Sequence, residues 1–95
     1  MKMTAGSLHA SRLKLIENIC QSNALVKQGK IFLEAAQFQK AMVQFDQAIK
    51  LYPKNSGAFY YRAQANQRLC HYKSAANDFQ FAQQFGHNKI SIHQK

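Results

Sequence analysis

The feature that most constrains this chain is that its sequence matches itself after a shift of 34 residues. Under that shift, small residues fall on small residues, and aromatic or large apolar residues fall on large ones. The matched pairs are Ala24 with Ala58, Leu25 with Phe59, Phe38 with Tyr72, Ala41 with Ala75, Phe45 with Phe79, Ala48 with Ala82 and Leu51 with Phe85. Because a fixed period of this length is the signature of repeat architectures, the sequence predicts two copies of one supersecondary unit.

Each copy has the residue spacing of a pair of helices. Apolar and small residues recur every three to four positions, and these stripes cover residues 25–36, 41–51, 59–69 and 75–85. The first pair is interrupted near Gln37. Pro53 ends the second stripe, and Gly86 is a suitable stop for the last one. The pattern therefore predicts four helices and an all-α fold.

This pattern resembles the tetratricopeptide repeat (TPR) family, whose motif is W-x2-L-G-x2-Y…A-x3-F…P. The residues that match the motif are Leu25, Gly29, Phe32, Ala41, Phe45 and Pro53 in the first copy, and Phe59, Ala63, Ala75 and Phe79 in the second. Gln28, Asn66 and His87 depart from it. The resemblance implies an α-α superhelix of two helix-turn-helix repeats, in which the first helix of each repeat lines a concave, protein-binding groove.

The repeats divide the chain into five segments. We expect a flexible N-terminus at 1–6, an N-terminal helix at 7–21, the first repeat at 22–55, the second at 56–89 and a short tail at 90–95. The N-terminal helix is predicted from apolar residues at helical spacing between Leu8 and Cys20, and it either packs on the first repeat or runs into it.

Composition narrows the class of protein. The 95 residues carry 13 Lys and Arg against four acids, a formal charge of +9, which favours acidic partners. No apolar run approaches the roughly 20 residues that span a bilayer, and the N-terminus lacks the apolar core of a signal peptide. Cys20 and Cys70 stand far apart, outside any C-x-x-C motif, so we expect a reducing, cytoplasmic location and no disulfide.

No catalytic or metal-binding pattern is present in the sequence. The four acids are scattered, and G-x-S-x-G, H-E-x-x-H and phosphate-binding glycine motifs are absent. Cys70 and His71 are neighbours in a predicted turn, where we interpret Cys70 as replacing a more usual glycine. We therefore expect a protein that is not an enzyme and that uses no cofactor and no metal.

The candidate groove combines positive charge with large amphipathic side chains. The residues one helical face away from the packing stripes are Asn23, Lys27, Lys30, Tyr60, Tyr61, Gln64, Gln67 and Arg68, with Val26 and Glu34 beside them. Lysine, arginine and tyrosine in that combination suit an acidic peptide or protein segment. We expect Tyr61→Ala to abolish such binding without lowering the melting temperature.

One family subtype does not fit. Co-chaperone TPR domains hold the C-terminal carboxylate of a chaperone through Lys and Asn residues on these inner helices. This sequence has Val26, Lys30 and Tyr61 at matching places, and it lacks a third repeat. We therefore do not expect a chaperone-tail carboxylate clamp, and we interpret Arg62, which does match an arginine of that subtype, as a structural or rim residue.

Two other functions remain open at this point. The last stripe carries Phe79, Phe81 and Phe85 with only a short tail after it, and these residues are candidates for self-association into a homodimer. The charge of +9 also permits weak, salt-sensitive and sequence-independent nucleic-acid binding. The adaptor function, binding another protein, is the main hypothesis. We expect no membrane association.

Overall fold

A computed structural model describes the fold of residues 2–86, with side chains described from residue 11 onward. Its four helices are α1 (Lys2–Glu34), α2 (Phe38–Leu51), α3 (Ser56–Arg68) and α4 (Tyr72–Gln84). The all-α prediction is confirmed, because residues 2–86 contain helices and turns and no strand. Residues 87–89 of the second predicted repeat and the predicted tail at 90–95 lie outside the described residues.

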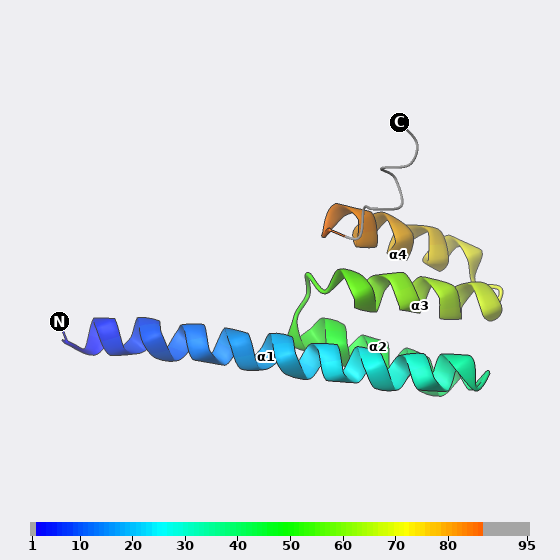
Figure 1. Cartoon of the computed structure of the whole chain (residues 1–95). Helices are drawn as coiled ribbons and strands as arrows, with labels where there is room; N and C mark the ends of the chain where they lie inside the picture. The colour runs from blue at the N-terminus through cyan, green and yellow to red at the C-terminus, as the bar shows by residue number, and fades with distance from the viewer. Residues whose placement is uncertain (1, 87–95) are drawn as a thin grey trace.

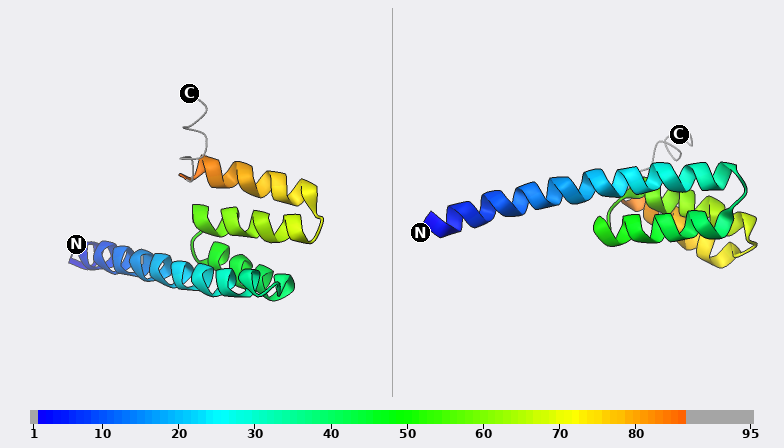
Figure 2. Two further views of the ribbon diagram at one scale, coloured as in Figure 1. Left: turned by 45° about the vertical axis from the view of Figure 1, so that its right-hand side comes forward. Right: turned by 90° about the horizontal axis from the view of Figure 1, so that it is seen from below.

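The helices form two antiparallel pairs (Figure 1). The C-terminal half of α1 packs on α2, and α3 packs on α4. Between the pairs, α3 contacts α2 and, over a smaller area, α1. The N-terminal half of α1 extends well beyond the other helices, which Figure 2 shows from two further sides.

The turns inside the two pairs have the same backbone structure, 34 residues apart. Ala36 and Cys70 both adopt a left-handed conformation, with φ of 62° and 65°. Gln37 N–H donates to Phe32 O and His71 N–H donates to Asn66 O, both at 2.8 Å. These bonds satisfy carbonyls that a helix end would otherwise leave unpaired. Cys70 thus occupies a position that normally favours glycine, as predicted.

The first pair is held by a close approach of α1 and α2 at Gly29. Phe45 is fully buried on α2, between the fully buried Ala41 and Ala48. A Cβ on Gly29 would lie within 2.8 Å of three atoms of the Phe45 ring. Glycine is therefore the residue that lets the aromatic ring lie directly against the α1 backbone.

A hydrogen-bond network joins α1 to the loop between α2 and α3. Ser22 Oγ donates to Ala48 O at 2.6 Å, and Asn55 Nδ2 donates to Ser22 Oγ at 2.8 Å. Asn55 Oδ1 also accepts from the backbone N–H of Ala58 at 3.1 Å, which caps the start of α3. Since Ser22 and Asn55 are both buried, this network fixes the start of α3 relative to α1 and α2.

The predicted N-terminal helix is continuous with the first helix of the first predicted repeat, one of its two expected arrangements. α1 begins at Lys2 and continues without interruption to Glu34. Its 33 residues correspond to about 50 Å. The physical reason is that no proline or left-handed residue breaks the helix near residue 21, so the predicted helix runs into the repeat.

Candidate functional site

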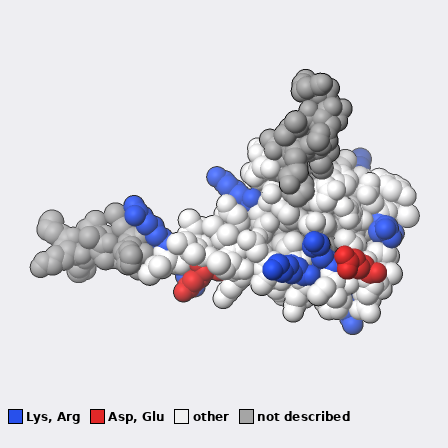
Figure 3. Space-filling view, viewed as in Figure 1, with Lys and Arg blue, Asp and Glu red and all other residues white. Residues whose placement is uncertain are grey.

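The candidate site is the surface formed by the C-terminal half of α1 together with α3, which we call the α1/α3 face. All eight residues selected from the sequence lie on these two helices: Asn23, Lys27, Lys30, Tyr60, Tyr61, Gln64, Gln67 and Arg68. In Figure 3, basic side chains gather over the C-terminal half of α1 and its border with α3, next to an acidic one.

Lys30 and Tyr61 meet across the junction of the two helices. Lys30 Nζ lies 4.8 Å from the centroid of the Tyr61 ring, a cation–π distance. The same ring stacks on Phe45 with centroids 6.4 Å apart. Tyr61 is therefore both a surface residue and part of the packing between the pairs. Our expectation that Tyr61→Ala leaves stability unchanged conflicts with this contact, because the substitution would remove a ring that covers Phe45.

Tyr60 packs toward α4, whereas Tyr61 packs toward the first helix pair. Its ring lies 5.7 Å from that of Phe79 on α4 and 5.1 Å from that of Tyr61, both edge-on. Adjacent aromatic residues can both be half-buried here because α3 lies between the first pair and α4. The tyrosine pair thus contributes packing in two directions, and only its outer edges belong to the α1/α3 face.

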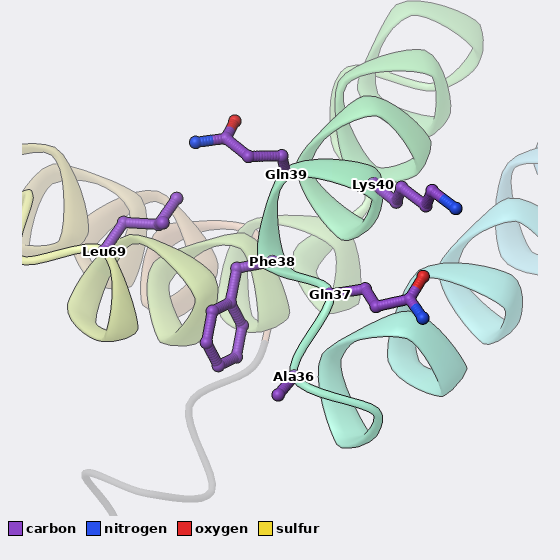
Figure 4. Close-up of a pocket in the computed structure, with 6 residues that line it drawn as sticks. All are labelled: Ala36, Gln37, Phe38, Gln39, Lys40 and Leu69. Atoms are coloured by element: carbon purple, nitrogen blue, oxygen red, sulfur yellow. The ribbon is translucent and has the colours of Figure 1, made fainter.

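Arg68 lies at the far end of α3, beside the first turn of α2. Its guanidinium is 5.8 Å from the centroid of the Phe38 ring. Phe38 and Leu69 line an open, largely apolar hollow of about 380 Å³ with residues 36, 37, 39 and 40, and Figure 4 shows the Phe38 and Leu69 side chains around it. Arg68 is thus about two helical turns along α3 from Tyr61 and its contact with Lys30.

The remaining polar residues have different surroundings. Lys27 is exposed and lines a shallow hollow of about 310 Å³ with Lys30, Ile31 and Glu34. Asn23 Oδ1 accepts a hydrogen bond from Asn55 at 3.0 Å, so it also supports the loop network. Gln67 is exposed and Gln64 is half-buried. Val26, expected beside the groove, is buried in the core.

A charged network links three helices, and its carboxylates had no predicted role. Arg62 on α3 donates through Nε and Nη2 to both carboxylate oxygens of Asp78 on α4, at 2.9 and 2.8 Å. Its Nη1 donates to Asp46 on α2 at 2.8 Å, and Asn66 Nδ2 donates to Asp78 at 3.0 Å. The three charged residues are spaced 16 apart in the sequence, a regularity that no helical period explains.

The network accounts for Arg62 and Asn66 in structural terms. Asp78 is buried, and a buried carboxylate requires partners that donate hydrogen bonds. The hydrogen bond to Asp78 raises the pKa of Arg62, with a further contribution from Asp46, although burial of the guanidinium opposes it. Asn66 replaces the aromatic residue of the family motif and completes the coordination of Asp78. Arg62 is a structural residue, one of its two expected roles.

The aromatic residues of the last helix do not act as one set. Phe79 packs on Tyr60 inside the second pair. Phe81 and Phe85 stack on each other with centroids 6.1 Å apart, and both contact the buried Phe59 of α3, at 5.2 and 5.7 Å. Phe81 remains 42% exposed. Of the three candidates for self-association, Phe81 offers the most open surface.

The described residues contain no cluster of side chains suited to a metal ion. Among the described residues, no three His, Cys, Asp or Glu side chains lie close enough together to bind a metal. Cys20 and Cys70 are both exposed and unbonded. The Tyr72 hydroxyl donates to Cys70 Sγ at 3.5 Å, and this contact raises the pKa of Tyr72.

Within residues 2–86, each helix is too short or too polar to cross a bilayer. No protein-family model matches the sequence, and no curated protein matches it significantly.

Proposed function

We propose that this protein is a non-catalytic adaptor of the TPR type that binds an acidic protein segment on its α1/α3 face. The observation that carries the proposal is that the cations on this face have no carboxylate partner among the described residues. Lys27, Lys30 and Arg68 all lie more than 4 Å from every carboxylate among the described residues, whereas Arg62 is paired with two acids. Cations without an acidic partner suit carboxylate-bearing ligands, and Lys30 also lies against the Tyr61 ring.

Charge alone does not distinguish this face from the rest of the surface. Lys40, Lys50 and Lys73 are exposed on α2 and α4, so basic residues surround the whole molecule. What favours the α1/α3 face is the combination of lysine with tyrosine, as in the Lys30–Tyr61 contact, whereas Lys40 lies over the ring of Phe32, which has no hydroxyl. Nucleic acid is the competing partner that a dispersed positive charge would attract.

The test is capture of partners from a lysate at physiological salt, with and without nuclease. We expect a protein that remains bound after nuclease treatment and is lost from a Lys27→Glu, Arg68→Glu double variant. These two residues are exposed, so the substitutions preserve the core, which Tyr61→Ala does not. If all captured material disappears with nuclease, the charge serves nucleic-acid binding and the adaptor proposal is wrong.

Self-association is a second candidate because of Phe81. Its ring is 42% exposed at the edge of a cluster with Phe59 and Phe85, and an exposed aromatic ring on a terminal helix is unusual for a stacked helical array. Light scattering on the concentrated protein tests this directly. A dimer that Phe81→Gln converts to a monomer would support it, and a strict monomer at high concentration would exclude it.

A further inference from the structure

The N-terminal half of α1 carries apolar side chains that no other helix covers. α1 is about 50 Å long, whereas its antiparallel partner α2 has 14 residues and covers about 21 Å. All described side chains from residue 11 to 17 are exposed. Leu15 and Ile16 are 52% and 56% exposed. We call residues 2–21 the α1 projection (Figures 1 and 2).

These apolar side chains are continuous with an interface already formed in the fold. Leu15 and Ile19 are followed at helical spacing by Ser22, Val26 and Gly29. The last three are buried against α2 and the α2–α3 loop. The side of α1 that packs inside the first pair therefore continues onto the projection, where Ile19 is half-buried and Leu15 is exposed.

The same apolar side chains also lead onto the α1/α3 face. Residues that share this side of α1 at intervals of three to four positions are Arg12, Ile16, Ile19, Asn23, Lys27 and Lys30. Arg12 and Lys30 are 18 residues apart, which is five helical turns and about 27 Å. Glu17 lies about 140° around the helix from Arg12 at 100° per residue. This row of side chains, which we call the track, is apolar at its centre and basic at both ends. Glu34 follows Lys30 by four residues on the same side of α1 and lies in the same hollow as Lys27 and Lys30.

Exposed leucine and isoleucine on the same side of a helix indicate a docking surface. We infer that the acidic partner binds as an amphipathic helix laid along α1, with its apolar side on Leu15, Ile16 and Ile19. Its carboxylates pair with Arg12 at one end and with Lys27 and Lys30 at the other. This inference rests on the proposed function and extends that site along the projection.

Charge selects this occupant over a second copy of the chain. Each molecule carries a charge of +9. Pairing two projections would bring the Arg12 side chain and the basic end at Lys27 and Lys30 of one molecule close to those of the other, and like charges repel at close range. An acidic helix instead gains attraction at both ends of the track. Helix-on-helix docking of this kind uses apolar anchors at i, i+3, i+4 and i+7. Counted from Arg12, the apolar residues Leu15, Ile16 and Ile19 occupy the last three of these positions.

The experiment titrates the full chain into a labelled synthetic peptide of about 18 residues, the length that spans five turns. The peptide has leucine at its a and d positions and glutamate on the flanks, and a twin peptide has lysine in place of each glutamate. Fluorescence anisotropy at physiological salt gives the dissociation constants. We expect the glutamate peptide to bind and the lysine twin to bind at least roughly tenfold more weakly.

Variants of the chain then locate the bound peptide. Leu15→Gln with Ile16→Gln should weaken binding by roughly tenfold, and Lys27→Glu should weaken it as well. The matched control is Gln21→Ala, because Gln21 is exposed on the same projection but lies at least about 120° around the helix from Leu15, Ile16 and Ile19. It should change the affinity by less than roughly twofold. Circular dichroism checks that all variants keep their helical content.

Each other outcome overturns the inference in a distinct way. If Lys27→Glu weakens binding while the Leu15, Ile16 double variant binds normally, the α1/α3 face binds acids but the projection takes no part. If the glutamate peptide does not bind at all, the inference fails, and the lysate experiment still decides the proposed function. If the chain alone is a dimer that the double variant makes monomeric, a second copy covers the projection.

Discussion

Replacement of Gly29 by alanine tests the central packing contact of the first helix pair. Alanine is favoured over glycine inside a helix by about 1 kcal/mol, so this substitution would stabilise an exposed helix. Here the new Cβ would lie within 2.8 Å of three atoms of the Phe45 ring. Phe45 is fully buried and cannot move into solvent, and overpacking of this kind costs about 1–3 kcal/mol. Because the approach is so close, we take the upper end and expect a net loss of about 1–2 kcal/mol.

The assay is urea and thermal unfolding followed by circular dichroism, with Gly57→Ala as the matched control. At Gly57 the added Cβ would meet only Asn55 Oδ1 at 3.4 Å and Val26 Cγ1 at 4.0 Å, so that variant should be more stable by about 0.5 kcal/mol. Each kcal/mol corresponds to a Tm change of about 4–8 °C in a domain of this size. If Gly29→Ala is as stable as Gly57→Ala, α1 and α2 do not approach as described. A Phe45→Leu substitution should relieve the clash and recover part of the loss.

Three further substitutions test the charged network, the loop network and the turns by the same unfolding assay. Asp78→Asn should lower the free energy of unfolding by about 2–3 kcal/mol because it breaks the buried, bidentate pair with Arg62. Asp46→Asn should lower it by less than about 1 kcal/mol, because that carboxylate is 56% exposed. Equal losses for the two variants would contradict this ranking. Asn55→Ala should cost about 2 kcal/mol, since it removes the α3 cap and the bond to Ser22 together; a loss below about 0.5 kcal/mol would mean that water replaces both contacts. Ala36→Gly should raise stability by about 0.5–1 kcal/mol, because φ is 62° there, and a loss of stability would argue against the left-handed turn.

The helices and their turns were predictable because they depend on local patterns. The spacing of Ala41, Phe45 and Ala48 predicts the buried side of α2, and all three residues are fully buried. The turns at Ala36 and Cys70, 34 residues apart, have matching φ values and hydrogen bonds, which is consistent with the 34-residue shift. Periodicity is sufficient here because each feature involves residues within one or two turns of helix.

The contacts between helices were not predictable in the same way. Arg62 reaches two acids that are each 16 residues away on different helices, and no pattern within a single helix identifies those partners. The two tyrosines of α3 were assigned to a groove because adjacent residues cannot share one packing stripe. They are half-buried because α3 has neighbours on two sides, which only the arrangement of the pairs reveals.

The adaptor proposal is tested most directly by a charge-matched comparison of two double variants. The first variant combines Lys27→Glu with Arg68→Glu on the α1/α3 face, and the second combines Lys50→Glu with Lys73→Glu on α2 and α4. Both variants change the net charge by the same amount. Calorimetric titration of the captured protein into both variants and the wild type gives the affinities. We predict a loss of at least roughly tenfold for the first variant and less than roughly twofold for the second. Equal losses would show that binding follows total charge, and would contradict a site on the α1/α3 face.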